Sequence, residues 1–164
     1  MRFVILCIVF AAVLGVSVPT VKACYCSVPE VPRALNRASA VFVGEVIEVI
    51  DPRTSDEKAS PPGRFYTIRF KVEKSWKGVA SQEIEVLSAQ GKYGCFAYPP
   101  VSKGERYLVY ADPLYFDGAF QKGWLIITTC NRTKLLANAS ADLKKLEGIK
   151  NPFFNPYFPR RRRN

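Results

Sequence analysis

The sequence predicts a mostly β fold in which five strands are closed by a carboxy-terminal helix. Residues Arg64–Lys74 show clear alternation between apolar and polar side chains, which is typical of a half-buried strand. Val41–Ile50 is an almost continuous β-branched run, which indicates a second, more deeply buried strand. Helical spacing of apolar residues is clear near the end, over Lys134–Leu146. Together these patterns favour a small sheet with few helices.

The first elements follow a proline-containing start. A short helix is predicted over Arg33–Ala40, because Ala34, Leu35 and Ala38 share one apolar face. In the strand Val41–Ile50, Gly44 indicates a bend or a bulge. The next residues, 51–63, contain three prolines and several charges and are predicted to form an exposed loop.

The strand Arg64–Lys74 is the clearest in the chain. Its inward side chains are Tyr66, Ile68, Phe70 and Val72, and its outward side chains are Thr67, Arg69, Lys71 and Glu73. Trp76-Lys77-Gly78 is predicted to be a corner, with Trp76 packed beneath the sheet.

Three further strands are predicted at Glu83–Leu87, Glu105–Asp112 and Trp124–Thr129, with Ile84 and Val86 of the first pointing inward. The last of them delivers Cys130 at its end.

Residues 112–123 between the last two strands predict a hairpin with aromatic residues near its tip, namely Tyr115, Phe116 and Phe120. Exposed aromatic side chains there would indicate a binding surface, whereas buried ones would cap the sheet.

The closing helix over Lys134–Leu146 has Gly148 as its stop signal. Its apolar face comprises Leu135, Leu136, Ala139, Leu143 and Leu146. Five strands and a closing helix fit a small Greek-key barrel of the OB type, a topology that periodicity alone does not supply.

Residues 1–23 are predicted to be a secretory signal, with Arg2 at its start, an apolar run, and small residues before a cut after Ala23. Removing 23 of the 164 residues leaves 141, enough for one domain, and lowers the formal charge from +10 to +8 because Arg2 and Lys22 are lost. We expect a secreted, soluble monomer without a transmembrane segment. Its basic charge favours anionic partners such as glycosaminoglycans, while secretion argues against nucleic acid.

Cleavage would give Cys24 a free α-amine, whose ordinary pKa of about 7.7 to 8.0 leaves it partly neutral near physiological pH. That amine and the carbonyl of Cys24 can chelate a metal in a five-membered ring. A catalytic zinc keeps one open, water-filled position that such a chelate could occupy.

The four remaining cysteines, Cys24, Cys26, Cys95 and Cys130, indicate two disulfides in an oxidising compartment. Three pairings are open on sequence alone. A four-cysteine zinc site is the competing interpretation, although the chain lacks paired Cys-x-x-Cys units.

A mature chain that begins Cys-x-Cys resembles the tissue inhibitors of metalloproteinases. The resemblance covers most of the mature chain, and its further landmarks are Phe42-Val43-Gly44-Glu45-Val46, Ser75-Trp76-Lys77-Gly78, the isolated Cys95, Gly104-Glu105-Arg106-Tyr107-Leu108-Val109-Tyr110, and Cys130.

This resemblance implies a netrin-like inhibitory domain over residues 24–150, with the OB-type barrel and the disulfides Cys24–Cys95 and Cys26–Cys130. It implies that the protein has no cofactor of its own and contacts the zinc of a target metalloproteinase through Cys24. Tyr25 would enter the adjacent specificity pocket, and Cys26, Ser27 and Val28 would continue along the cleft.

The implied Cys24–Cys95 bond would also bring Tyr93, Gly94 and Phe96 beside the reactive terminus. These three are second-rank candidates for the protease interface. The alternative is that Tyr93 and Phe96 only pack locally around the disulfide.

The chain departs from the family pattern in three ways. It has Tyr25 where the inhibitors usually carry a small residue, often with a hydroxyl; a deep apolar pocket could accept this ring, whereas a shallow one would clash with it. It has no cysteine near Leu35-Asn36, and it lacks the separate cysteine-rich carboxy-terminal domain. It is therefore similar to the inhibitory half alone.

The chain contains no histidine, which removes the commonest general base and metal ligand and argues against an enzyme. Besides inhibition, two functions stay open: a non-inhibitory netrin-like module that binds extracellular matrix or glycosaminoglycan, and a structural or secretory effector that reuses the fold.

Two other features carry weaker signals. Residues 151–164 combine aromatic residues and prolines with four consecutive arginines, and are predicted to be a flexible basic tail. Asn131 and Asn138 each begin a glycan acceptor motif.

Overall fold

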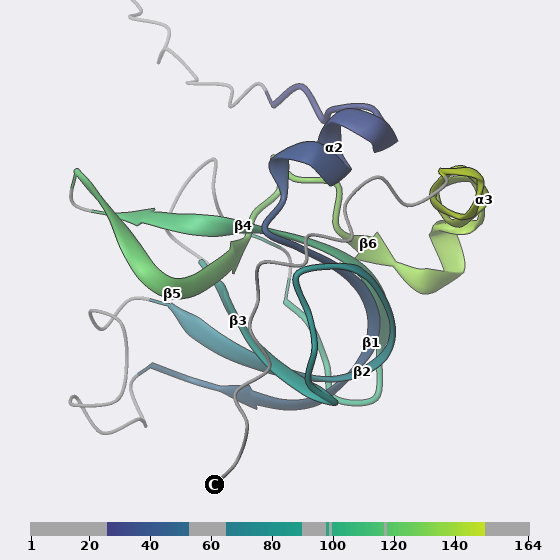
Figure 1. The fold of residues 1–164 in the computed structure, drawn as a ribbon. Coiled ribbons are helices and arrows are strands. Elements are labelled where there is room, and N and C mark those ends of the chain that lie inside the picture. The colour runs from purple at the N-terminus through teal and green to yellow at the C-terminus, as the bar shows by residue number, and fades with distance from the viewer. Residues whose placement is uncertain (1–25, 53–64, 90–97, 99, 117, 150–164) are drawn as a thin grey trace, which may run out of the picture.

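The computed structural model describes residues 26–52, 65–89, 98, 100–116 and 118–149. Within them the fold is mostly β, a six-stranded mixed sheet with two short α-helices (Figure 1). The elements are α2 (Val31–Arg37), β1 (Ala40–Ile50), β2 (Tyr66–Lys77), β3 (Glu83–Ser88), β4 (Arg106–Phe116), β5 (Ala119–Ile127), β6 (Lys134–Leu135), the 3-10 turn η2 (Leu136–Asn138) and α3 (Ser140–Gly148).

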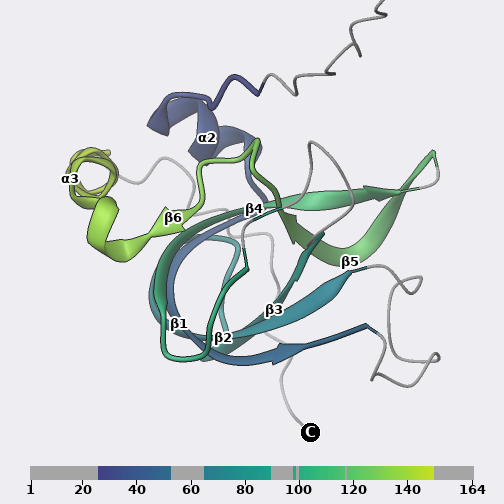
Figure 2. The same cartoon turned by 180° about the vertical axis from the view of Figure 1, so that it is seen from behind.

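The strand order is β1-β2-β3-β5-β4-β6, and β1 pairs with β4 as well as with β2. Five strands therefore form a partial ring, and both views show the sheet curving round on itself (Figures 1 and 2). The neighbours pair antiparallel except at β3 and β5, whose parallel contact joins Leu87 to Ile126 and Ser88 to Ile127. This short contact is the least extensive pairing in the ring.

The pairing of β1 with β2 is irregular. Its register against β2 shifts three times, once beside Gly44, so the predicted irregularity at this glycine is confirmed. A Cβ placed on Gly44 would lie 2.9 Å from the carbonyl oxygen of Lys71. Only glycine lets the two strands approach so closely here.

The two faces of β1 bury different sets of side chains, as expected for a strand covered on both sides. On one face Phe42 meets Phe70 edge to face, with ring centroids 5.5 Å apart. On the other, Val41 and Val43 belong to a second apolar cluster together with residues of α2 and α3. Both helices lie outside the ring in Figure 1, where they cover that second face.

The first helix begins at Val31, two residues earlier than predicted, because Pro32 is well suited to a helix's first turn. It ends at Arg37, and the ammonium of Lys77 donates to the carbonyls of Leu35 and Asn36, each at 2.9 Å. Trp76 and Lys77 lie within β2, so the predicted corner is confined to its last residue, Gly78, where the chain turns with φ +70°. Trp76 packs against the second apolar cluster, as predicted.

The prediction of one helix over Lys134–Leu146 was also wrong. Lys134 and Leu135 pair with Leu108 and Tyr107 as β6, and the helix α3 starts only at Ser140. Hydrogen bonds to the open edge of β4 satisfy the backbone N–H and C=O groups that a helix would satisfy internally. The tertiary context therefore overrides the helical spacing of the apolar residues.

Candidate functional site

The start of the described chain is covalently joined to the segment that follows β5. A disulfide links Cys26 to Cys130 across 104 residues of sequence, with their Cα atoms 5.1 Å apart. This is the pairing that the family resemblance implies, and the structure confirms it. We call residues Cys26–Pro29 the amino-terminal strip and Cys130–Thr133 the anchor segment.

The anchor segment is itself held by the strands beneath it. The side-chain amide of Asn131 is buried and donates to the carbonyl of Ile126 at 3.4 Å. The hydroxyl of Thr133 accepts from the backbone nitrogen of Tyr110 at 2.9 Å and donates to its carbonyl at 3.2 Å. The hydroxyl of Tyr98 donates to the carbonyl of Thr133 at 3.1 Å. The anchor segment is therefore hydrogen-bonded to the strands rather than forming an independent loop.

Arg132 forms a second attachment to the strip. Its Nη1 donates to the carbonyl of Pro29 at 2.7 Å. The same guanidinium makes a bidentate pair with Asp142 of α3, with Nε to Oδ2 at 2.6 Å and Nη2 to Oδ1 at 2.9 Å. Lys134 adds a third cationic contact, 3.1 Å from Oδ2 of Asp142. The strip is thus tied to the anchor through both Cys26 and Pro29.

The Asp142 side chain is only 4% exposed and that of Arg132 15%. Burial by itself would raise the pKa of Asp142, but hydrogen bonds from Arg132 and Lys134 outweigh it and hold the pKa below its usual value. The hydrogen bond to Asp142 likewise raises the pKa of Arg132, against the effect of burial. Both groups are therefore charged under ordinary conditions, as a buried pair needs to be.

Between its two attachments the strip faces solvent. Ser27 is exposed and Val28 is 47% exposed, whereas Val31, the first residue of α2, is fully buried. The strip has no regular secondary structure. Ser27 and Val28 therefore form a short exposed ridge within the strip, fixed by Cys26 on one side and by Pro29 on the other. This geometry is suited to lying in another protein's cleft.

Only part of the predicted interface lies in the described region. Cys26, Ser27 and Val28 lie together on the ridge. The remaining predicted residues fall outside the described residues, namely Cys24, Tyr25, Tyr93, Gly94, Cys95 and Phe96. The second proposed disulfide, Cys24–Cys95, falls outside them too.

Sequence reasoning missed Arg132 and Asp142. One signal could have indicated Asp142, since it lies four residues before Leu146 and so shares the apolar face of the helix. A carboxylate on a buried face needs a cationic partner. Nothing in the local pattern identified Arg132 as that partner.

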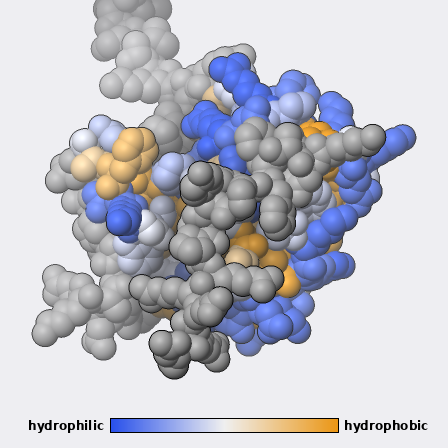
Figure 3. Space-filling model, in the orientation of Figure 1, coloured by the Kyte–Doolittle hydropathy of each residue, from blue (hydrophilic) through white to orange (hydrophobic). Residues whose placement is uncertain are grey.

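The β4–β5 hairpin presents a second exposed surface, the aromatic pair Tyr115 and Phe120. Their side chains are 60% and 71% exposed, and their rings meet edge to face with centroids 5.0 Å apart. The Tyr115 hydroxyl donates to the carbonyl of Gly118 at 2.8 Å. Apolar surface gathers over this hairpin at the left of the molecule (Figure 3). The exposed alternative left open by the sequence is therefore the one observed for these two residues.

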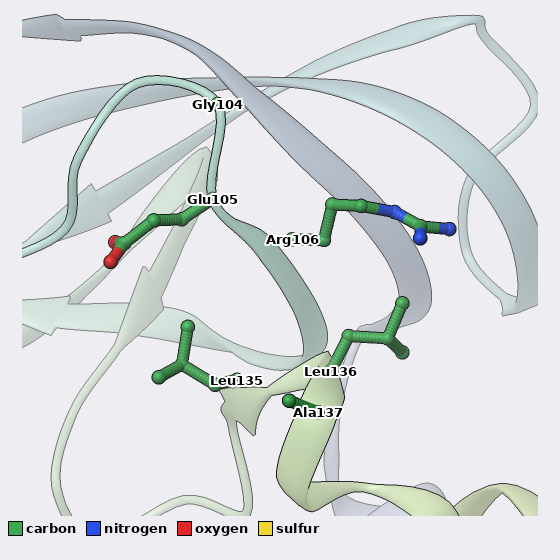
Figure 4. Close-up of a pocket in the computed structure, with 6 residues that line it drawn as sticks. All are labelled: Gly104, Glu105, Arg106, Leu135, Leu136 and Ala137. Atoms are coloured by element: carbon green, nitrogen blue, oxygen red, sulfur yellow. The ribbon is translucent and has the colours of Figure 1, made fainter.

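A cavity of about 390 Å³ lies beside β6 (Figure 4). Its lining residues are Gly104, Glu105, Arg106, Leu135, Leu136 and Ala137. The carboxylate of Glu105 accepts from the backbone nitrogen of Ser102 at 2.7 Å and from the Tyr107 hydroxyl at 2.8 Å. Arg106 pairs with Glu73, its Nε 2.8 Å from Oε1. Both charged groups are hydrogen-bonded to neighbouring residues. The two leucines and Ala137 form the apolar part of the lining.

The two glycan acceptor asparagines differ in accessibility. Asn131 is 7% exposed, and its amide nitrogen is already hydrogen-bonded. Asn138 is exposed at the end of η2. The structure therefore favours Asn138 as the accessible acceptor in the folded protein.

The described residues include no group of three potential metal ligands. They also include no helix with the length and apolar character that membrane crossing requires.

Comparison with known proteins leaves the family open, since no family model matches the chain and no curated protein matches it significantly.

Proposed function

We propose that this protein is a secreted inhibitor of zinc metalloproteinases that acts through Cys24. The observation that carries the proposal is the two-point attachment of the exposed ridge Ser27-Val28, which directly follows the proposed chelating terminus. We also propose that the partial ring is an OB-type Greek-key barrel of the netrin-like kind. Its five-strand connectivity supports this.

The proposed mechanism begins with removal of residues 1–23. The neutral α-amine and the carbonyl oxygen of Cys24 then bind the open position of the target's zinc and displace its water. Tyr25 enters the adjacent pocket of the protease. Cys26, Ser27 and Val28 follow along the cleft as a substrate would.

Rigidity is what the described contacts contribute. A ridge that is already ordered loses less conformational entropy on binding than a free chain end, so more of the interaction energy appears as affinity. The disulfide and the guanidinium of Arg132 both restrict the ridge before any protease arrives.

The direct test is to titrate the secreted, disulfide-intact protein against a panel of zinc metalloproteinases. The matched control carries one extra alanine before Cys24, which removes the chelating amine from its place without touching the sheet. We expect inhibition by the first protein and loss of inhibition by the second, at equal thermal stability. If the extended protein inhibits with full potency, the proposed zinc chelation by Cys24 is wrong. If the protein with a verified Cys24 terminus inhibits no protease of the panel, the proposed inhibitory function is wrong.

The second candidate is a non-inhibitory extracellular binding module. The exposed Tyr115–Phe120 pair favours it, because exposed aromatic side chains are enriched in binding surfaces. The positive net charge of the chain would suit an anionic matrix or glycosaminoglycan partner. Retention on heparin that falls with salt, together with inactivity toward every protease, would favour this candidate.

A further inference from the structure

We propose that Arg132 is a positioning residue that sets the direction of the amino-terminal strip, and that Asp142 orients Arg132 for this purpose. The inference rests on the proposed function, because direction matters only if the strip presents Cys24 to a zinc ion. It assigns a role to two residues that no motif identifies.

A disulfide alone does not set the direction of the strip. The Cys26–Cys130 bond holds one point of the strip, but rotation about its single bonds leaves the direction of the neighbouring residues open. A second attachment three residues further on removes that freedom. The carbonyl of Pro29, held by Arg132 at 2.7 Å, is such an attachment.

The geometry of the second attachment requires an arginine. Guanidinium carries five N–H donors in a fixed plane. In this structure Nε and Nη2 bind the two oxygens of Asp142, and Nη1 is directed to Pro29. The bidentate pair therefore fixes the plane from which the third contact is made. A lysine has one nitrogen and cannot hold the carboxylate in this forked way while making the third contact from a separate atom.

Neighbouring residues keep the Arg132–Asp142 pair in place. Asp142 is nearly fully buried in α3, and Lys134 from β6 also contacts its Oδ2, the oxygen that Nε of Arg132 binds. The anchor segment that carries Arg132 is bound to Tyr110 of β4 through Thr133. On the strip side, Glu30 pairs with Lys145 of α3 at 3.3 Å. The guanidinium is thus supported from the sheet and from α3 at once.

The experiment compares Arg132→Lys and Arg132→Gln with the wild type by ¹⁵N relaxation of the Ser27 and Val28 amides, without any protease. We expect order parameters near 0.85 in the wild type and below about 0.6 in both variants. Arg132→Lys should recover part of the melting temperature, since its ammonium still pairs with Asp142, but none of the strip's order. A partly recovered melting temperature without recovered order of the strip would distinguish a positioning role of Arg132 from a general contribution to stability.

Two controls sharpen the comparison. Arg106→Gln breaks a solvent-exposed arginine–carboxylate pair with Glu73, and Ile68→Val removes one buried methyl group from the core. Neither should change the order of Ser27 or Val28. Unchanged order in Arg132→Lys, or an equal loss of order in Ile68→Val, would overturn the proposal.

Inhibition is then measured separately on the same variants. We expect about tenfold weaker inhibition for Arg132→Lys, because the ridge must be ordered on binding. If Ser27 and Val28 lose order in the Arg132 variants but the wild type inhibits no protease, the proposed function is wrong and the structural role of Arg132 stands. Lost order with undiminished inhibition would overturn the positioning role itself.

Discussion

The rings of Tyr115 and Phe120 meet edge to face across the β4–β5 hairpin while both remain largely exposed to solvent. These residues are direct cross-strand partners in the hairpin ladder. A pair of this kind stabilises a hairpin modestly and leaves two large apolar side chains available to a partner.

Replacing both Tyr115 and Phe120 by alanine should lower the free energy of unfolding by no more than about 1 kcal/mol, because little buried surface is lost. Protease inhibition should stay within about twofold of wild type, since the proposed interface lies on the amino-terminal strip. Chemical denaturation and inhibition assays check the two parts. A large loss of inhibition with intact stability would move the protease interface to the hairpin.

Asp142→Asn should lower the free energy of unfolding by about 3 kcal/mol, because it leaves Arg132 without its buried charge partner. The matched control is Glu147→Gln, which breaks the exposed pair with Lys74 at 2.9 Å. That variant should change stability by less than about 0.5 kcal/mol. Urea denaturation measures both, and equal effects would contradict the structural importance of the Arg132–Asp142 pair.

Two carboxylates, the buried Asp142 and the half-buried Asp112, should contribute to stability in opposite senses in acid. The pKa of Asp142 is lowered in the folded protein by hydrogen bonds that overcome burial, so its contribution is full above the unfolded pKa of about 3.9 and is lost as pH falls through the folded pKa. Burial raises the pKa of Asp112 despite the nearby cations Arg37 and Lys77. Its contribution therefore declines as pH rises from the unfolded pKa to the folded pKa.

The measurement is denaturant stability as a function of pH for the wild type, Asp142→Asn and Asp112→Asn. The difference between wild type and Asp142→Asn should shrink as the solution is acidified. The difference between wild type and Asp112→Asn should change in the opposite sense. Parallel curves for the two variants would show that one of the two carboxyls is wrongly placed.

Gly78 and Gly104 both have positive φ, +70° and +87°, but their surroundings differ. A Cβ at Gly78 would lie 1.9 Å from the carbonyl oxygen of Ser39, whereas a Cβ at Gly104 meets nothing within 4 Å. Gly104→Ala should therefore cost about 1–2 kcal/mol from backbone strain alone. Gly78→Ala should cost at least about 3 kcal/mol, because the start of β1 must also move.

Thermal and chemical unfolding of the two glycine variants decide this point. A similar cost at both positions would indicate that the close approach of Gly78 to Ser39 is not maintained in solution.

Several features of the fold were predictable because they depend on neighbours in sequence. Alternation in β2 correctly placed Ile68 and Phe70 in the core, and Gly44 marked the irregularity in β1. The two-residue strand β6 was not predictable, because Leu135 fits a helical pattern equally well. Its state depends on the open edge of β4, which the local sequence does not contain.

The candidate site divides in the same way. The sequence by itself determined which cysteines were available for pairing, and the residues of the strip that follow the proposed terminus. Only the tertiary structure decided that Arg132 holds Pro29, since these residues are 103 positions apart and meet where the anchor segment passes the strip. Periodicity reports which face of an element is buried; it does not report which distant hydrogen-bonding group that face will meet.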